Sequence, residues 1–160
     1  MSRVFVGLGS NLHQPARQLQ RAFGELAEIP GTSLEARSSL YVSQPMGPAD
    51  QPDYLNAVAR LETVLEPLAL LDRLQAIETL HQRRRERHWG PRTLDLDLLL
   101  YDDLVMDSPR LRIPHPGMGE RDFVLEPLLE IGGDIEIPGR GRAADLLAQC
   151  RVRTARRIDE

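Results

Sequence analysis

Between residues 94 and 101, leucines alternate with a second set of side chains that includes two carboxylates. Leucine occupies positions 94, 96, 98 and 100, and the positions between them are Asp95, Asp97, Leu99 and Tyr101. Successive side chains of a β-strand point to opposite faces of the sheet. The alternation therefore predicts a half-buried strand with the four leucines on one face and both carboxylates on the other.

The two carboxylates of this strand are candidates for a metal site. At the rise of a β-strand, side chains two residues apart lie roughly 7 Å from each other. Two bare carboxylates at that separation repel each other and are costly to desolvate. A hard cation removes that cost, and Mg²⁺ in proteins is usually held by one or two carboxylates together with substrate phosphates. The alternative is an outward-facing pair that is neutralised by arginines.

An arginine cluster lies just upstream, in the segment HQRRRERHWGPR (81–92). Its basic residues are Arg83, Arg84, Arg85, Arg87 and Arg92. Guanidinium groups bind phosphate through paired hydrogen bonds, so the cluster indicates phosphate clamps, with a solvated surface loop as the alternative. Trp89 in the same segment suggests a lid that closes over substrate, or else a simple anchor of the loop to the body.

The order of apolar patterns predicts an α+β fold. We expect strands at 3–8, 33–42, 54–63 and over the Asp-x-Asp segment, and helices at 15–29 and 67–80. Short segments should follow: paired strands near 104–106 and 110–113, a helix at 119–131 interrupted near Pro127, an edge strand at 134–137 and a helix at 142–149. The β-α-β-β-α-β order is typical of a ferredoxin-like antiparallel sheet with helices packed on it, here with an extra C-terminal strand and helix. We expect one domain over 1–160, with 139–160 as its peripheral tail.

Composition restricts the class of protein further. At 41% hydrophobic and 28% charged residues, the 160-residue chain is typical of a soluble globular protein. Its one cysteine, Cys150, rules out an internal disulfide, and all 20 basic residues are arginine, so a lysine-dependent P-loop kinase is excluded. We find no secretory leader and no apolar run of membrane length, which predicts a cytoplasmic protein without membrane association. The net charge of −4 argues against a general nucleic-acid binder.

Three further groups of residues are candidates for function. Prolines flank His115 and fix its backbone, which suits a phosphate contact, although an ordinary turn is equally consistent. Tyr54 and Asn56 share a strand face, and Phe123 could complete an aromatic slot for a flat heterocycle. The Gly7-x-Gly9 pair lacks the third glycine and the parallel βαβ context of a dinucleotide loop, so we interpret it as part of a turn at Gly9, Ser10 and Asn11.

Several long motifs now point to one family. They are GLGSN (7–11), DQPDYLNAV (50–58), WGPRTLDLDLLLYDD (89–103) and RLRIPHPGMGERDFVLEPL (110–128). In this order and spacing they resemble the 6-hydroxymethyl-7,8-dihydropterin pyrophosphokinases of folate biosynthesis. The resemblance implies transfer of pyrophosphate from ATP to the hydroxymethyl group of the pterin, with AMP as the other product. It also implies small-molecule substrates, ATP and the dihydropterin. We expect no nucleic-acid partner and a monomer.

The same resemblance implies a set of site residues. Asp95 and Asp97 would hold two Mg²⁺ ions, and with Arg83 and Arg92 they would form the catalytic set. Residues implied to bind ATP or to close over it are Gln75, Glu78, Arg85, Trp89, Arg92, Arg110, Leu111, His115 and Arg121. Residues implied to bind the pterin are Ser43, Met46, Tyr54, Asn56 and Phe123, with the ring stacked between the two aromatic side chains.

Two other classes of protein fit parts of the sequence. A ferredoxin-like RNA-binding module could use the arginine cluster as its basic patch. The net charge, the 4% aromatic content and the lack of an RNP-type motif disfavour it. A different Mg²⁺-dependent phosphoryl enzyme, such as a nucleotidyl transferase or a nuclease, would share the Asp-x-Asp strand. Before the family resemblance is considered, only the Tyr54, Asn56 and Phe123 group separates that class from a pterin enzyme.

Overall fold

A computed structural model describes residues 1–44, 52–81 and 93–158 of the chain. The strands of its main sheet are β1 (Ser2–Ser10), β2 (Thr32–Arg37), β3 (Tyr41–Ser43), β4 (Tyr54–Thr63), β5 (Asp95–Tyr101) and β10 (Arg156–Arg157). The helices are α1 (Pro15–Ala27), α2 (Pro67–His81), η1 (Met118–Glu120, a 3₁₀ turn), α3 (Asp122–Gly132) and α4 (Ala143–Ala148). Two small ribbons pair β6 (Met106–Asp107) with β7 (Arg112–Ile113) and β8 (Glu136–Ile137) with β9 (Gly141–Arg142).

The main sheet is antiparallel throughout and has the order β10-β3-β4-β1-β5. The ten-residue β4 is long enough to pair with β1 along one edge and with both β2 and β3 along the other. If β2 and β3 are taken together, this is the strand arrangement of a ferredoxin-like fold. The predicted α+β class with its antiparallel sheet is therefore confirmed.

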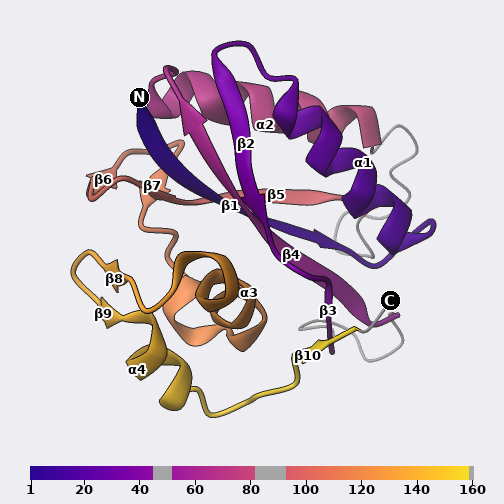
Figure 1. Cartoon of the computed structure of the whole chain (residues 1–160), viewed down its shortest axis with the longest axis vertical. Helices are drawn as coiled ribbons and strands as arrows, with labels where there is room; N and C mark the ends of the chain where they lie inside the picture. Colours follow the sequence, from indigo (N-terminus) through magenta and orange to yellow (C-terminus); the bar gives the residue numbers. More distant parts are fainter. Residues whose placement is uncertain (45–51, 82–92, 159–160) are drawn as a thin grey trace.

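The helices cover the two faces of the sheet (Figure 1). Helices α1 and α2 pack on one face, where Val4, Val6 and Leu8 of β1 point toward them. Helix α3 packs on the other face, where Phe5 belongs to a second core together with Val58, and α4 packs against α3. Because strand side chains alternate, one sheet supplies both cores. Val58 is the residue of β4 in this second core, whereas Asn56 and Tyr54, on the same face nearer the start of β4, are not part of it.

The stretch predicted as one strand at 33–42 is two strands, β2 and β3. The break falls at Ser38, whose side-chain oxygen accepts the N–H of Val58 at 2.8 Å in place of a backbone carbonyl. Such local side-chain bonds compete with the ladder of a sheet. The short edge strand predicted at 134–137 is only β8, and it pairs with β9 outside the main sheet.

Pro127 does not interrupt its helix, contrary to the prediction. Helix α3 runs without a break from Asp122 to Gly132, with Pro127 inside it. A proline in a helix removes one backbone hydrogen bond and crowds the preceding turn. In α3 the buried Val124, Leu125 and Leu128 pack on the sheet and hold the helix together despite that cost.

Leu100 does not share a face with the earlier leucines of its strand. Phe5 pairs with Leu100 and Val6 with Leu98, so Leu99 is an extra residue in β5, a β-bulge. After the bulge the alternation is reversed. Leu96 and Leu98 join the core under α1 and α2, whereas Leu99 and Leu100 both join the core under α3.

Candidate active site

Asp95 and Asp97 lie on β5 at the edge of the sheet, on the face opposite to the core under α1 and α2. Both side chains are only partly buried, and that of Asp97 is 45% exposed. Between them, the N–H of Leu96 donates to the Glu78 carboxylate of α2 at 2.8 Å. The predicted sharing of one face by the two carboxylates is therefore confirmed, and a third carboxylate is held beside them.

The bulge in β5 places His115 next to this pair. The Leu99 carbonyl accepts the N–H of His115 at 3.0 Å, which ties the turn after β7 to the strand. The N–H of Gly117 donates to Nδ1 of His115 at 3.2 Å, so in the neutral ring Nε2 carries the proton. That atom lies 3.9 Å from Oδ1 of Asp97.

Several groups act on the protonation of His115. Burial is the largest influence and lowers the pKa of His115 below its ordinary value of 6.5; the charge of Asp97 acts to raise this pKa, and the charges of Arg121 and Arg140 act to lower it. The ring is therefore neutral near pH 7 and presents an N–H donor. A neutral donor can hydrogen-bond to an anionic oxygen without adding a full charge to the site.

A cleft of about 430 Å³ opens beside these groups, and we call it the α2–β5 cleft. It is bounded by α2, β5 and the segment 108–116, and among the residues that line it are Gln75, Glu78, Asp97, Arg110, Leu111 and His115. Arg110 donates to Asp72 at 2.6 Å and to Gln75 at 3.3 Å, both on α2. The cleft thus brings together six side chains that the sequence predicted for one site; Asp72 is a partner that the sequence analysis missed.

A second group of predicted residues lies at the start of β4. Asn56 is 5% exposed, and its Nδ2 donates to the Ser43 hydroxyl at 2.7 Å. Ser43 pairs with Tyr54 across β3 and β4, so the three side chains are neighbours. This hydrogen bond fixes the amide orientation, and Oδ1 of Asn56 is directed toward β1.

The floor between this group and the aspartates is formed by Gly9 of β1, which we call the glycine floor. A Cβ at Gly7, two residues earlier, would instead lie 3.4 Å from the side chain of Leu99 in the second core. The register pairs Gly9 with Asn56 on one side and with Asp95 on the other, so the three residues form one row across the sheet. A Cβ at Gly9 would lie 3.4 Å from Oδ1 of Asn56. Of the turn predicted at Gly9, Ser10 and Asn11, the first two residues are instead the end of β1, and the open floor is a feature that the sequence analysis missed.

Phe123 and Arg121 stand at the start of α3, on the same side of the sheet. The Arg121 guanidinium lies 6.0 Å from the centre of the Phe123 ring, within reach of a cation–π contact. A Cβ at Gly117 would come within 2.7 Å of that guanidinium, so the position of Arg121 depends on a glycine there. Phe123 packs against the second core and is partly exposed.

The remaining predicted site residues lie outside the described residues. They are Met46, Arg83, Arg85, Trp89 and Arg92. Among the described residues, no group of three or more His, Cys, Asp or Glu side chains has the arrangement of a metal-binding cluster. In the same part of the chain, no helix combines the length and the apolar character that a membrane span requires.

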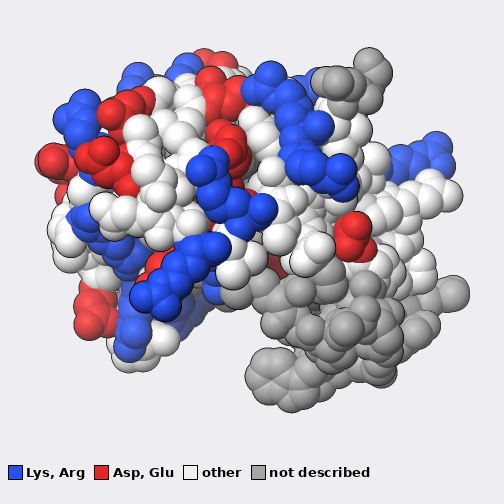
Figure 2. Space-filling view, turned by 90° about the horizontal axis from the view of Figure 1, so that it is seen from below, with Lys and Arg blue, Asp and Glu red and all other residues white. Residues whose placement is uncertain are grey.

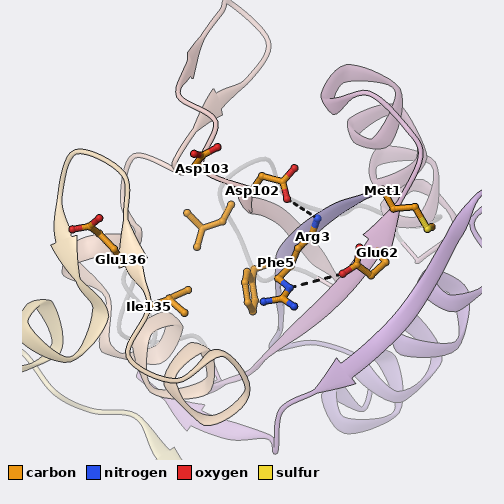
Figure 3. Close-up of a pocket in the computed structure, with 9 residues that line it drawn as sticks. Met1, Arg3, Phe5, Glu62, Asp102, Asp103, Ile135 and Glu136 are labelled. Atoms are coloured by element: carbon orange, nitrogen blue, oxygen red, sulfur yellow. Dashed lines mark hydrogen bonds and ion pairs between the residues drawn. The ribbon is translucent and has the colours of Figure 1, made fainter.

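A second hollow, of about 490 Å³, lies at the opposite end of the sheet (Figure 3). Here the Arg3 guanidinium forms an ion pair with Glu62 at 3.8 Å, and the backbone N–H of Arg3 donates to the Asp102 carboxylate at 2.8 Å. Phe5 forms part of the wall, and none of the predicted site residues lines this hollow. Elsewhere, on the face seen from below, basic and acidic side chains are interspersed over the described surface (Figure 2).

Comparisons with known proteins agree on one family. The family model described as 7,8-dihydro-6-hydroxymethylpterin-pyrophosphokinase (HPPK) matches residues 5–133. The 2-amino-4-hydroxy-6-hydroxymethyldihydropteridine pyrophosphokinase of Pseudomonas aeruginosa is 50% identical over 150 residues, which cover 94% of this chain and 93% of the relative. The Haemophilus influenzae enzyme of the same name is 48% identical, with 93% of each chain covered.

Solved structures give the same result for the fold. The crystal structure of Plasmodium falciparum HPPK-DHPS with pteroate superposes with a TM-score of 0.73 over 92% of this chain, at 14% identity. This chain spans 42% of that longer one. The long matches at high identity and the shared fold lead to one conclusion: the chain belongs to the 7,8-dihydro-6-hydroxymethylpterin-pyrophosphokinase family.

Proposed function

We propose that the α2–β5 cleft binds ATP, that the surface over the glycine floor binds the pterin, and that the reaction takes place between them at Asp95 and Asp97. The reaction itself follows from the family: pyrophosphate passes from ATP to the hydroxymethyl group of 6-hydroxymethyl-7,8-dihydropterin, a step of folate biosynthesis. The observation that supports the placement is the row of Asn56, Gly9 and Asp95. This row connects the amide of one subsite to the carboxylates of the other.

Asp95 and Asp97 suit Mg²⁺, and we propose that they hold two ions. Their oxygens are hard ligands, they share one face, and the exposure of Asp97 leaves room for phosphate oxygens to complete the coordination. Bound Mg²⁺ neutralises phosphate charge and lowers the pKa of a coordinated hydroxyl. Glu78 holds β5 through Leu96 and so keeps the two aspartates in place.

The protein's own groups would position the nucleotide. The neutral His115 presents its Nε2 proton to a phosphate oxygen, while Arg110 and Arg121 supply fixed positive charge. We propose that Arg85 and Trp89 also contact ATP, and that Arg83 and Arg92 neutralise charge on the group in transfer. Little covalent chemistry is then required of the protein, because phosphoryl-type transfer depends mostly on positioning and electrostatics.

The pterin subsite depends on shape and on one oriented amide. We propose that the ring lies over the glycine floor and stacks between Tyr54 and Phe123, with Met46 and Ser43 beside it. The hydrogen bond from Nδ2 of Asn56 to the Ser43 hydroxyl turns the amide so that Oδ1 points away from Ser43. We propose that this Oδ1 accepts an N–H of the heterocycle. A side chain at Gly9 would fill the same space.

Product identity tests the reaction and its site together. The protein is incubated with ATP, Mg²⁺ and 6-hydroxymethyl-7,8-dihydropterin, and the nucleotides are resolved by chromatography. We expect AMP to appear only with the pterin and in step with a pterin diphosphate. Asp97→Asn should lower kcat by about two orders of magnitude or more, because it removes a metal ligand.

The matched control is Asp103→Asn, an exposed aspartate at the second hollow, which should turn over like the wild type. Formation of ADP would contradict pyrophosphate transfer. Near-normal turnover by Asp97→Asn would contradict the metal role but leave the reaction in place.

A further inference from the structure

One arginine outside the α2–β5 cleft, Arg140, forms hydrogen bonds with the backbone carbonyls of the turn that carries His115. Arg140 lies in the turn between β8 and β9, the small ribbon that stands beside α4 in Figure 1. Its Nη1 donates to the carbonyls of His115 at 2.8 Å and Pro116 at 3.0 Å. Its Nη2 donates to the carbonyl of Pro114 at 3.2 Å. One side chain therefore binds three successive backbone carbonyls.

The sequence of the turn explains why it needs such a partner. Proline has no N–H, so between 114 and 116 the only backbone donor is that of His115, and it is bonded to Leu99. The His115 carbonyl also accepts the N–H of Met118 at 3.2 Å, so Arg140 is its second donor, whereas Arg140 supplies the bonds to the carbonyls of Pro114 and Pro116. A donor matters most for the partly buried carbonyl of Pro114, because an unpaired buried carbonyl is costly. A guanidinium offers five N–H groups in a rigid plane and can serve all three, which a single ammonium cannot do in the same geometry.

The turn is thus fixed from two sides, by the bulge of β5 and by Arg140. What it presents is the imidazole whose Nε2 lies 3.9 Å from Asp97. The side chains that line the cleft include His115 but not Arg140. Arg140 therefore contacts the turn and not the cleft, and the contacts through which it can position a ligand are those to the turn.

We propose that Arg140 is a positioning residue for ATP binding, which sets the place of His115 in the α2–β5 cleft without touching the nucleotide. This proposal rests on the proposed function, because it takes ATP to be the ligand of the cleft. The two flanking prolines restrict the backbone conformations of the turn. The hydrogen bonds from Arg140 then fix the position of the turn relative to the cleft. The proposal adds a residue of the C-terminal ribbon to the site.

The same ribbon offers a matched control. Arg142 lies two residues further on, and its side chain is 58% exposed. Its guanidinium donates to the side chain of Asp134 at 3.1 Å and to the backbone carbonyl of the same residue at 3.2 Å. Arg142→Ala therefore removes one arginine and its bonds from the ribbon while it leaves the His115 turn untouched.

The experiment compares Arg140→Ala, Arg140→Lys, Arg142→Ala, His115→Ala and the double variant Arg140→Ala/His115→Ala. The readouts are the KM for ATP, the KM for the pterin, kcat and the melting temperature. We expect Arg140→Ala to raise the KM for ATP on the order of tenfold, with the KM for the pterin unchanged. Arg140→Lys should restore part of this loss, and Arg142→Ala should have the wild-type KM.

The double variant separates positioning from general stability. If Arg140 acts through His115, its removal adds nothing to the KM for ATP once His115 is gone, whereas independent effects would multiply. The proposal would be overturned if the two single effects on the KM for ATP multiplied fully in the double variant. It would also be overturned if both Arg140 variants had the wild-type KM while His115→Ala raised it. Either result would leave the nucleotide site intact. A wild-type KM in His115→Ala would overturn both the proposal and the assigned role of His115. If Arg140→Ala does not fold, Arg140→Lys and its double variant with His115→Ala carry the same comparison.

Discussion

Gly9 shows how one missing side chain can shape a site. It lies in β1 between Asn56 and Asp95, and neither it nor Gly7 has a positive φ, so backbone conformation does not require a glycine at either position. The space above Gly9 does require a glycine, if a flat ligand is to lie there. Glycine is the only residue that leaves the backbone of a strand bare, and it allows close approach of another molecule.

Gly9→Ala is therefore expected to fold but to bind the pterin poorly. The new methyl would lie 3.4 Å from Oδ1 of Asn56 and 3.8 Å from Cδ1 of Tyr54, which are ordinary contacts. We expect a melting temperature near that of the wild type and a KM for the pterin about tenfold higher or more, since overfilling a packed site costs about 1–3 kcal/mol. Steady-state kinetics at saturating ATP measures this.

Gly24→Ala is the control for that substitution. Gly24 lies inside α1, and an added Cβ would meet no atom within 4 Å apart from its chain neighbours and the backbone of its own helix, so alanine should stabilise the helix by roughly 0.5–1 kcal/mol and leave the KM unchanged. An unchanged pterin KM in Gly9→Ala would contradict the assignment of the floor to the substrate.

At the scale of elements, long and strongly patterned segments were predictable, and features set by tertiary partners were not. The alternation of β4 and the 3.6-residue spacing of α1 each determine their element locally. The split at Ser38 depends on a bond to Val58 of another strand, and the bulge at Leu99 depends on the register with β1. Neither partner can be identified from the local sequence.

In the candidate site too, features that depend on residue type were predictable, and features set by tertiary partners were not. Chemistry that depends on residue type, such as the carboxylates of Asp95 and Asp97, was predictable from the sequence and the family resemblance. The glycine floor and Arg140 were not, because their positions arise from strand register and from a ribbon that is remote in the sequence. A glycine in a predicted strand next to a predicted site is the signal that could have revealed the floor.

The C-terminal strand β10 is anchored by a polar network that the sequence did not indicate. Arg157 of β10 forms an ion pair with Glu130 of α3 at 3.0 Å, and Glu130 also accepts the Tyr41 hydroxyl at 2.9 Å. The N–H of Ala155 donates to Asp122, next to Phe123, at 2.8 Å. The tail thereby connects the edge of the sheet to the start of α3.

Glu130→Gln should destabilise the protein in a pH-dependent way. Burial alone would raise the pKa of Glu130, but hydrogen bonds from Tyr41 and Ser39 and the charge of Arg157 bring it below the ordinary value of 4.5. A carboxylate with a lowered folded-state pKa contributes stability that is complete above the unfolded-state pKa and is lost as the pH falls through the folded-state pKa. We expect the variant to melt below the wild type at pH 7, and the difference to shrink as the pH falls below 4.5.

Melting curves of both proteins between pH 7 and pH 3 measure this effect. Glu126→Gln, which removes the more exposed ion pair with Arg153, is the control and should change stability little at any pH. A difference between Glu130→Gln and wild type that stays constant over the whole range would show that the carboxylate charge is not the cause.

For the whole molecule, the strands that carry the site residues also supply side chains to both hydrophobic cores. Each of β1, β4 and β5 supplies side chains both to the core under α1 and α2 and to the core under α3. The proposed ATP cleft lies beside α2, whereas Phe123 belongs to α3. A ligand that bridges these parts stabilises the folded chain as a unit if the two cores unfold together, as the predicted single domain implies.

Calorimetry with Mg²⁺ and a non-hydrolysable ATP analogue tests this coupling. At a ligand concentration of about 100 Kd, binding to the folded state alone adds roughly 2.7 kcal/mol. For a chain of this length that corresponds to a rise in Tm of about 5–10 °C. We expect a single transition with equal calorimetric and van't Hoff enthalpies, and we expect EDTA to remove most of the rise, because Asp95 and Asp97 would then repel the phosphates. An equal rise in EDTA would contradict the Mg²⁺ requirement, and two separate transitions would contradict the single domain.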